Sequence, residues 1–326
     1  MSQHKVLITG ITGFVGSHLA DYILEHHPDT QVIGMARWRS PKENIQHIRD
    51  KITLECGDLT DPNSMRNILI EHEPDIIFHL AAQSYVPYSF KAPIATLYSN
   101  VIGTANILEE IKQLKRLCKY DPIVHICSSS ECYGQVTEDE VPIKETNEFR
   151  PASPYAVSKV GEDMLALQYW LSWKIKTIRT RLFTHTGPRR GSVFATSTFA
   201  KQIALIETGK QQPVIEVGNL DSVRTFMDVG DAVRAYWILV RQCRPGEVYN
   251  IGGNETMTVE QMLNKLLNLS TRKDIKIKVD PARLRPSDVT LQIPDTSKFR
   301  NETGWKPEVP FDKTLENLLN YWRAKV

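Results

Sequence analysis

Two residues one helical turn apart have the types and the spacing that suggest chemistry most directly. Tyr155 and Lys159 lie four positions apart, which places both side chains on one face of a helix. A free tyrosine, with a pKa of about 10, is a poor base at neutral pH, but nearby positive charge such as an ammonium favours the phenolate. The phenolate can remove a hydroxyl proton while the same carbon loses a hydride. We therefore predict that Tyr155 is a catalytic base and that Lys159 is its charged partner.

A run of serines precedes this helix. Ser129 lies in the segment Ser128–Glu131, directly after a strand predicted at Val124–Cys127. Open α/β sheets present functional loops at the carboxyl ends of their strands. We predict that the Ser129 hydroxyl holds the reacting oxygen beside Tyr155. Turn chemistry alone also favours serine at such a place, so the run is informative only together with Tyr155 and Lys159.

A glycine-rich turn follows the first predicted strand, Lys5–Ile8, and leads into a helix predicted at Phe14–Glu25. Its three glycines permit a tight turn, close approach of the backbone to a pyrophosphate, and close packing of the helix on the sheet. We predict a dinucleotide site here; the other interpretation is an ordinary strand–helix turn. The residues assigned to the site are Gly10, Thr12, Gly13, Phe14, Val15 and Gly16.

The end of the second predicted strand bears on the choice between NAD and NADP. Where an acidic residue would bind the ribose 2′-hydroxyl of NAD, this chain has Arg37 and Arg39. A guanidinium forms paired hydrogen bonds with a 2′-phosphate, so we predict NADP as the cofactor. The alternative is that both arginines are solvated loop charges. Residues after the third and fourth strands are expected to border the same cofactor: Asp58, Leu59, Leu80, Ala81, Ala82 and Gln83.

These residues need a scaffold that brings several strand ends together. Apolar runs without alternation, separated by helical segments, are typical of a parallel sheet covered on both faces. The predicted strands are Lys5–Ile8, Gln31–Met35, Ile52–Glu55, Asp75–Leu80, Val124–Cys127 and Lys176–Leu182. The predicted helices are Phe14–Glu25, Asp61–His72, Pro93–Leu117 and Tyr155–Trp173. The fold class is therefore predicted as α/β, with a Rossmann-type doubly wound parallel sheet.

From about Gly187 the pattern loosens, and we expect a smaller C-terminal α/β substrate domain. Its predicted strands are Val214–Val217 and Glu247–Ile251, and its predicted helices are Thr198–Thr208, Val229–Val240, Val259–Leu267 and Phe311–Arg323. The proposed division is a cofactor-binding Rossmann domain over residues 1–186 and a substrate domain over residues 187–326, with some segments crossing back.

Charge and composition exclude several classes of protein. Forty Lys and Arg against 38 Asp and Glu leave a net charge of +2, without the basic excess of a nucleic-acid-binding protein. No apolar run reaches the roughly 18 residues of a membrane span, and no signal peptide is recognisable. The five cysteines lack Cys-x-x-Cys spacing, which favours reduced thiols over a metal site or a disulfide framework. We expect a cytoplasmic enzyme without a metal.

Taken together, Gly10-x-x-Gly13-x-x-Gly16, Ser129 and Tyr155-x-x-x-Lys159 resemble the extended short-chain dehydrogenase/reductase superfamily, whose members act on nucleotide sugars. Further segments are similar to GDP-mannose 4,6-dehydratases and to the related GDP-4-keto-6-deoxymannose reductases. They run nearly the whole chain: Gly57–Asp61, Leu80–Ser84, Ser153–Tyr155, Pro188–Gly191, Gly218–Asp221, Arg285-Pro286 and Gly304–Pro307. The first half is closer to the dehydratases and much of the second half to the reductases.

The resemblance implies NADP-dependent 4,6-dehydration of a GDP-hexose, with GDP-mannose as the expected substrate. Such an elimination needs a base that removes the C5 proton, and the carboxylate of Glu131 stands at the matching place. Similar reductases carry an acid at the same offset, so NADPH-dependent reduction of a GDP-4-keto-6-deoxy sugar remains an alternative. A 4-epimerase usually keeps NAD, and Arg37 argues against it. A redox sensor without catalysis typically lacks the Tyr155 and Lys159 pair.

The same resemblance assigns residues to the substrate. Arg224 and Arg285 match positions that hold the nucleotide diphosphate, and Asp288 stands where relatives usually have Glu, placed to bind guanine. The chain departs from the pattern at Thr184, where relatives have Asn, and at Thr225-Phe226, where the dehydratases have Asp-Trp. The expected substrate-binding residues are Ser84, Ser130, Thr184, Arg224, Arg285 and Asp288.

Arg189-Arg190-Gly191 resembles a loop that, in these dehydratases, reaches the cofactor of a neighbouring subunit. The resemblance therefore implies that Arg190 binds the cofactor and that the chain forms a homodimer or a homotetramer. The other interpretation is a basic surface loop.

Overall fold

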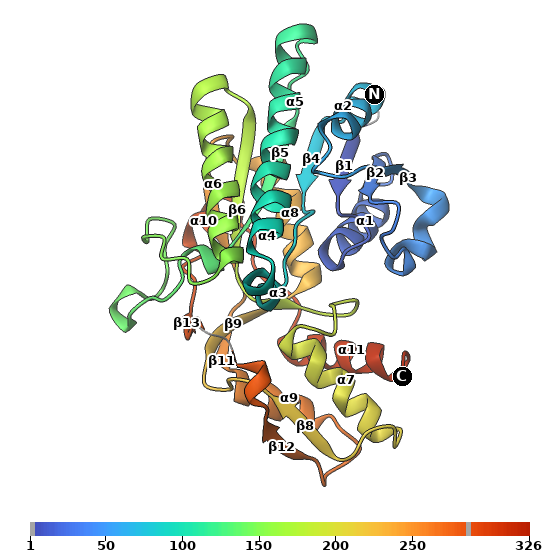
Figure 1. Cartoon of the computed structure of the whole chain (residues 1–326), viewed down its shortest axis with the longest axis vertical. Helices are drawn as coiled ribbons and strands as arrows, with labels where there is room; N and C mark the ends of the chain where they lie inside the picture. Colours follow the sequence, from blue (N-terminus) through green and yellow to red (C-terminus); the bar gives the residue numbers. More distant parts are fainter. Residues whose placement is uncertain (1–3, 285–287) are drawn as a thin grey trace.

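The central sheet of the protein consists of parallel strands. The computed structural model describes residues 4–284 and 288–326, and within them seven strands lie in the order β10-β6-β5-β4-β1-β2-β3 (Figure 1). The strands are β1 (Lys5–Thr9), β2 (Gln31–Ala36), β3 (Thr53–Cys56), β4 (Ile76–His79), β5 (Ile123–Ser129), β6 (Lys176–Leu182) and β10 (Val248–Ile251). The winding reverses between β1 and β4, as in a Rossmann fold. The predicted fold class is confirmed.

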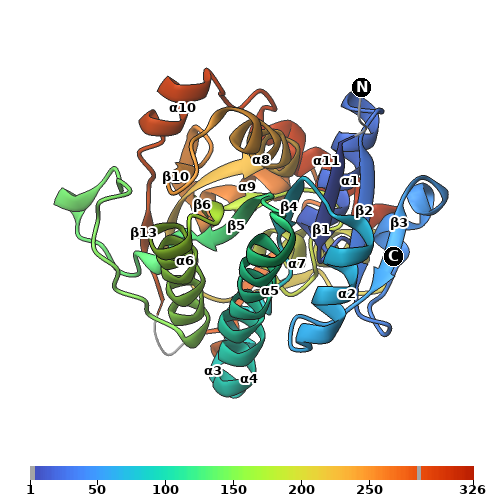
Figure 2. The ribbon, with the colours of Figure 1, turned by 90° about the horizontal axis from the view of Figure 1, so that it is seen from above.

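Helices cover both faces of this sheet. They are α1 (Phe14–His26), α2 (Pro62–His72), α3 (Val86–Lys91), α4 (Pro93–Leu97), α5 (Gly103–Cys118), α6 (Pro154–Trp173) and α8 (Val229–Gln242). Val6 and Ile8 of β1 pack into one buried cluster with α1 and α8, whereas Leu7 packs into a second with α2, α5 and α6 (Figure 2). Successive strand residues face opposite sides, so a strand covered on both faces is apolar throughout, as the sequence pattern indicates.

Short turns complete this part of the chain. The 3₁₀ turns are η1 (Glu43–Lys51), η3 (Ser130–Cys132) and η4 (Glu138–Glu140), and η2 (Tyr98–Ile102) is a π-helical turn. The sequence predicts one helix over Pro93–Leu117, but η2 divides that stretch into α4 and α5. A π turn widens the helix by one residue locally, which apolar periodicity does not reveal.

The second half of the chain builds a smaller α/β part, seen below the large sheet in Figure 1. Its elements are β7 (His185–Thr186), α7 (Ala195–Glu207), β8 (Val214–Val217), β9 (Val223–Asp228), β11 (Glu255–Thr258), α9 (Val259–Asn268), β12 (Lys276–Val279), η5 (Pro281–Arg283), β13 (Leu291–Gln292) and α11 (Phe311–Arg323). β8 pairs with β12, while β9 pairs with β7, β11 and β13. The helices α7, α9 and α11 share one buried apolar cluster.

Three elements that follow residue 187 belong with the large sheet. β10 pairs with β6, α8 packs beside α1 on one face, and α10 (Ser297–Thr303) packs against β10 and α8. The division of the chain after residue 186 stays a prediction. No helix within residues 4–284 and 288–326 combines the length and the apolar composition that crossing a bilayer requires.

Candidate active site

A cavity of about 1100 Å³ lies at the carboxyl ends of the large sheet's strands. In doubly wound folds this edge is where ligands bind, because the loops diverge where the winding reverses. Residues of the smaller part, among them Glu216 and Asn219, line the opposite wall. The cavity therefore lies between the dinucleotide-type sheet and the smaller part.

Most residues predicted for the site meet in this cavity. Those lining it are Gly10, Thr12, Gly13, Phe14, Val15, Gly16, Arg37, Asp58, Leu59, Leu80, Ala81, Ala82, Gln83, Ser84, Ser129, Ser130, Glu131, Tyr155, Lys159, Thr184, Arg190, Arg224 and Asp288. Arg39 is exposed and does not line it. Arg285 lies outside the described residues.

The glycine turn between β1 and α1 has the geometry of a phosphate cradle. Gly10 adopts a positive φ of 72°, which favours glycine. Gly13 precedes α1 without a side chain to cap it, so the first-turn N–H groups of the helix remain available to an anion. A Cβ on Gly16 would lie 2.4 Å from the Gly10 carbonyl oxygen. The turn therefore fits a pyrophosphate, and its third glycine lets the helix approach the strand.

The adenosine end of the cavity carries positive charge. Asp58 Oδ1 accepts hydrogen bonds from the Thr60 N–H at 3.0 Å and the Thr60 hydroxyl at 2.8 Å. Burial raises the pKa of Asp58, but these bonds and the charges of Arg37 and Arg39 bring it below its ordinary value. Within the described chain neither arginine forms a salt bridge. Arg37 lines the cavity, and its guanidinium fits a 2′-phosphate.

The loop after β4 is fixed by side-chain hydrogen bonds. The Thr9 hydroxyl accepts bonds from the Leu80 N–H at 3.0 Å and the Ala81 N–H at 3.1 Å. Gln83 donates its amide to Thr96 at 3.0 Å and accepts the Tyr85 N–H at 2.6 Å. The Gln83 N–H donates to Asn100 Oδ1 at 2.7 Å, and its carbonyl accepts from Asn100 Nδ2 at 3.0 Å, so both the side chain and the backbone of Gln83 order the loop.

Tyr155, Lys159 and Ser129 are brought together as the sequence predicts. The α6 helix begins after Ser153, whose side chain caps the Ala156 N–H at 3.1 Å. Its first turns present Tyr155 and Lys159 to the end of β5, where Ser129 lies. The Tyr155 and Ser129 side chains are hydrogen-bonded. The Lys159 ammonium lies 6.0 Å from the centre of the Tyr155 ring.

Burial and neighbouring charges shift the pKa values of Tyr155 and Lys159 in opposite directions. Burial raises the pKa of Tyr155 to about 12, although Lys159 and the bond with Ser129 lower it. Burial is the largest single effect on Lys159 and lowers its pKa, but Glu162, Tyr155 and Cys127 together raise the pKa above its ordinary value, so Lys159 stays charged. The buried phenol is therefore neutral at pH 7 until a further positive charge lies near it.

Glu131 lies directly beside this group. It belongs to the turn η3, and its N–H donates to the Ser129 hydroxyl at 3.2 Å. The side chain is half-buried and lines the cavity. Because Ser129 bonds both the Glu131 backbone and the Tyr155 phenol, an acid and a phenol share one wall of the cavity.

The two arginines of the 189–191 loop fold back onto their own chain. Arg189 forms a salt bridge with Asp21 of α1 at 2.6 Å. The Arg190 guanidinium packs over the rings of Phe14 and Phe194, at 5.2 Å and 4.1 Å from their centres. Burial lowers the pKa of Arg190 to about 10, which leaves it charged at neutral pH. In this structure Arg190 therefore lines the cavity of its own chain.

On the substrate side, Asp288 is already held by protein donors. Its Oδ2 lies 3.0 Å from Asn219 Nδ2 and 3.4 Å from the Ser222 hydroxyl. Arg224 lies 4.0 Å from Asp288 Oδ1, and its guanidinium donates to the Val223 and Val289 carbonyls. Asp288 thus positions Arg224 and the loop at Asn219, which limits its capacity to bind a base.

The remaining predicted substrate residues differ in what they offer. Ser130 is buried, and its hydroxyl donates to Gln292 at 2.9 Å. Thr184 is half-buried, and its carbonyl accepts the Met227 N–H at 3.0 Å. Thr184 therefore still presents its side chain to the cavity, whereas Ser130 ties η3 to β13.

Pattern reasoning missed several residues around the site. Asn219 and Ser222 hold Asp288, and Asn100 donates to Ser158 on α6 at 2.9 Å. Glu162 forms a salt bridge with Lys159 at 2.9 Å. Of these residues, only Glu162 could have been predicted from the sequence, because it stands three positions after Lys159 on the same helix face.

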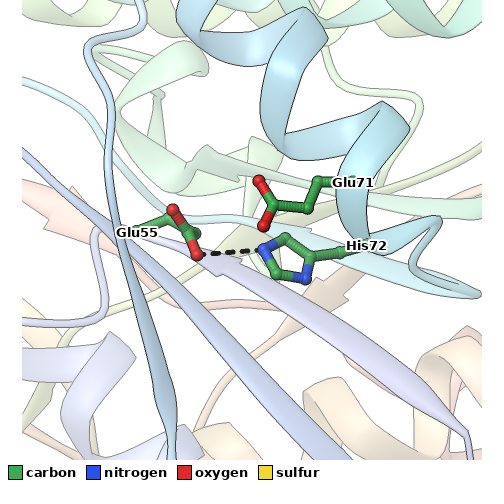
Figure 3. A group of neighbouring side chains, drawn as sticks. All are labelled: Glu55, Glu71 and His72. Atoms are coloured by element: carbon green, nitrogen blue, oxygen red, sulfur yellow. Dashed lines mark hydrogen bonds and ion pairs between the residues drawn. The ribbon is translucent and has the colours of Figure 1, made fainter.

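A group of potential metal ligands lies away from the cavity. Glu55, Glu71 and His72 place one ligand atom each within 4.8 Å of the others (Figure 3). The imidazole of His72 is already hydrogen-bonded to Glu55 at 3.0 Å, and none of the three lines the cavity. We assign no metal site to this group.

Comparisons with known proteins agree with this geometry. The family model of GDP-mannose 4,6 dehydratase matches residues 7–318. The GDP-6-deoxy-D-mannose reductase of Pseudomonas aeruginosa is 31% identical over 322 residues, which cover 99% of this chain and 98% of that protein. A GDP-mannose 4,6-dehydratase of Vibrio cholerae is 33% identical over 356 residues, covering 98% and 93%.

A solved structure of RMD from Pseudomonas aeruginosa, complexed with NADPH, superimposes with a TM-score of 0.85 at 30% identity, covering 99% of this chain and 100% of that one. The resemblance drawn from the sequence motifs is thereby confirmed over nearly the whole chain. The protein belongs to the GDP-mannose 4,6-dehydratase family, within the extended short-chain dehydrogenase/reductases.

Proposed function

We propose that this protein catalyses the NADP-dependent 4,6-dehydration of GDP-mannose to GDP-4-keto-6-deoxymannose. The observation that carries the proposal is the wall formed by Tyr155, Ser129 and Glu131, in which one serine hydroxyl joins the phenol to the backbone of the acid. Oxidation at C4 alone needs only the phenol. Elimination of water needs a second proton-transferring group within reach of C5, and Glu131 supplies it.

The residues divide the work as follows. When bound, NADP would supply the hydride acceptor for C4 of the sugar and, once reduced, the hydride donor for C6. Tyr155 removes the proton of the 4-hydroxyl, and Ser129 holds that oxygen as it becomes a ketone. Lys159 stabilises the phenolate by its charge. The ketone acidifies C5, and Glu131 removes the C5 proton and passes it to the C6 hydroxyl, which departs as water. Tyr155 then gives its proton to C5 as C6 is reduced, so both groups regain their starting states.

The coenzyme and the diphosphate have separate positive partners. The glycine turn is proposed to bind the pyrophosphate, and Arg37, which lines the cavity, is proposed to bind the 2′-phosphate. The relative solved with NADPH supports NADP rather than NAD. Arg224, on the opposite wall, is proposed to bind the GDP diphosphate together with Arg285. Thr184 is proposed to face the same group.

NADPH-dependent reduction of a GDP-4-keto-6-deoxy sugar is the second candidate. A specific observation favours it: one relative that spans nearly the whole chain is a GDP-6-deoxy-D-mannose reductase. Such a reaction uses Tyr155 to donate a proton and does not need Glu131 as a base.

The experiment that separates the two reactions follows both the sugar and the coenzyme. The dehydratase is expected to convert GDP-mannose to a 4-keto product with no net change in NADPH absorbance. Glu131→Gln is expected to lower that turnover by roughly 100-fold, the range for one general base. Consumption of one NADPH per GDP-4-keto-6-deoxymannose, with an unaffected Glu131→Gln variant, would instead establish the reductase.

We also propose that the chain forms a homodimer or homotetramer and works in the cytoplasm. Assembly is supported by exposed apolar side chains on α4, η2 and α6, among them Ile94, Tyr98 and Val157. The location is supported by the five cysteines, all of which are free thiols.

A further inference from the structure

A second buried carboxylate lies beneath the proposed catalytic pair. Glu162 follows Tyr155 by seven positions and Lys159 by three, so all three side chains share one face of α6. Glu162 is 1% exposed, and Lys159 is 5% exposed. Glu162 does not line the cavity, whereas Lys159 and Tyr155 do. The carboxylate thus contacts the lysine from the side away from the ligand space.

The ammonium is held by two oxygens of the protein. Lys159 Nζ donates to the Cys127 carbonyl of β5 at 2.9 Å and to Glu162 Oε2 at 2.9 Å. A lysine has three N–H donors. With two of them directed at β5 and at Glu162, the third is left for the cavity. Glu162 therefore fixes both the place and the direction of the ammonium.

The second oxygen of Glu162 is in an unusual situation. Among the described residues, no donor reaches the buried Oε1, and an ionised carboxylate with an unpartnered buried oxygen is costly. Burial accordingly raises the pKa of Glu162 to about 7, against the opposing charge of Lys159. The carboxyl group therefore changes its charge in the range in which the enzyme works.

Other titratable groups surround the pair on every packed element. On α6, Asp163 raises the pKa of Glu162, but its own carboxylate is bound by Arg179 and Arg181 of β6 at 2.9 Å each. Further groups that interact with Lys159 are Tyr155 on α6, Cys127 and His125 on β5, and His79 on β4. Towards η2, α6 is met by Asn100 and Val101.

Both histidines are neutral at working pH. Burial and the charge of Lys159 lower the pKa of His79 to about 3. Burial, His79 and Lys159 likewise lower the pKa of His125 to about 3. Glu162 is consequently the neighbour of Lys159 whose charge changes near pH 7.

We propose that Glu162 is a positioning residue that holds Lys159 and determines how much of its positive charge acts on Tyr155. This inference rests on the proposed roles of Tyr155 and Lys159. An ionised Glu162 offsets the ammonium and raises the pKa of the phenol, whereas a neutral side chain at this position leaves the ammonium's effect undiminished. A group with only a packing role would not alter the ionisation of Tyr155.

The test is the pH profile of kcat/KM for GDP-mannose. In Glu162→Gln we expect the acid limb, which reports Tyr155, to move to lower pH by about one pH unit, because the offsetting charge is gone. At a pH on the acid limb, kcat/KM relative to its plateau should then be about tenfold higher in the variant than in the wild type. Glu162→Asp keeps the charge and should retain a limb near that of the wild type.

Controls separate charge from packing. Glu110→Gln removes another buried carboxylate, which pairs with Arg66 at 2.8 Å outside the cavity, and should leave the limbs unchanged. If Glu162→Gln folds and its acid limb stays at the wild-type pH, while only the plateau value of kcat/KM falls, the proposal is overturned. A fully active Tyr155→Phe enzyme would instead refute the proposed function.

A binding measurement tests the inference without turnover. Calorimetric titration with NADP⁺ near pH 7, in two buffers of different ionisation enthalpy, counts the protons released. The positive nicotinamide favours ionised Glu162, so in a Tyr155→Phe background, where the phenol releases no proton, the protein with Glu162 should release a fraction of a proton that the protein with Glu162→Gln does not release. Equal release by both proteins would contradict the inference, whatever the sugar substrate is.

Discussion

At the level of single residues, burial outweighs charge at the proposed base. The pKa of Tyr155 lies near 12, above that of a free tyrosine, even though Lys159 and Ser129 both lower it. The two neighbours are therefore insufficient to make a phenolate at neutral pH. The positive ring of an oxidised nicotinamide is the additional charge that can do so. We infer that Tyr155 becomes a base only after the oxidised coenzyme has bound.

The proposed 2′-phosphate contact depends on one side chain, because Arg37 lines the cavity and Arg39 does not. Arg37→Ala should weaken NADP⁺ binding by roughly 10- to 100-fold, the value of one charge-assisted pair of hydrogen bonds, and leave NAD⁺ binding unchanged. Calorimetric titration with each coenzyme measures both, with Arg39→Ala as the matched control. A parallel loss for both coenzymes would exclude a 2′-phosphate role for Arg37.

Residue types and spacing predicted which residues meet at the site, but not the individual hydrogen bonds that they form. Tyr155, Lys159 and Ser129 meet because helix periodicity and strand ends can be read from a sequence. The hydrogen-bond partners of Gln83 and Ser130 could not be predicted from the sequence. Their side chains bond to Thr96 and to Gln292, the latter 162 positions away, and such long-range pairs leave no local pattern.

Among the elements, the β1–α1 unit makes the strictest demand on sequence. The helix crosses the strand end so closely that a Cβ on Gly16 would meet two backbone atoms, the Gly10 oxygen at 2.4 Å and Ile11 Cα at 2.9 Å. Backbone cannot yield as the end of a flexible side chain can. The third glycine is therefore required by packing, and through packing it places the helix N-terminus against the cavity.

Gly16→Ala should accordingly lower the free energy of unfolding by about 1–3 kcal/mol, as overpacking does, and weaken NADP⁺ binding. Gly191→Ala is the matched control, since its nearest atoms would lie at an ordinary 3.7 Å. Denaturant unfolding and coenzyme titration of both variants test this. If Gly16→Ala were as stable as Gly191→Ala, the helix would not be held by that close approach.

Element prediction succeeded where a segment continues the alternation of strands and helices or repeats apolar residues at helical spacing. Lys176–Leu182 and Phe311–Arg323 were predicted with the bounds that the structure has. β9 and β11 were missed because they mix polar and apolar types outside that alternation, as in Val223–Asp228. β12 was missed because every residue in it is exposed, so no apolar run marks it.

Considered as a whole, the molecule has one surface that a second copy would cover well. Ile94, Tyr98 and Ile102 lie four positions apart along α4 and η2 and are 75%, 52% and 41% exposed. Val157 of the neighbouring α6 is 46% exposed. Exposed apolar side chains gathered on adjacent helices are typical of interfaces, and this surface supports the proposed homodimer.

Tyr98→Glu should convert the assembly to monomers, because it would bury a charge in the interface. Light scattering after gel filtration measures the mass. Leu117→Glu places the same charge on an apolar residue that is 74% exposed at the end of α5, and it should leave the mass unchanged. A wild-type protein with the mass of one chain would rule out the assembly.

The return of β10 to the large sheet has a consequence for how the protein is made. β6 pairs with β5 on one side and obtains its second neighbour only from Val248–Ile251, and α1 is covered by α8. On the ribosome, the coenzyme half therefore stays unfinished until more than three quarters of the polypeptide has emerged. A truncated translation product that ends before β10 would expose an open edge, and quality-control proteases would recognise it.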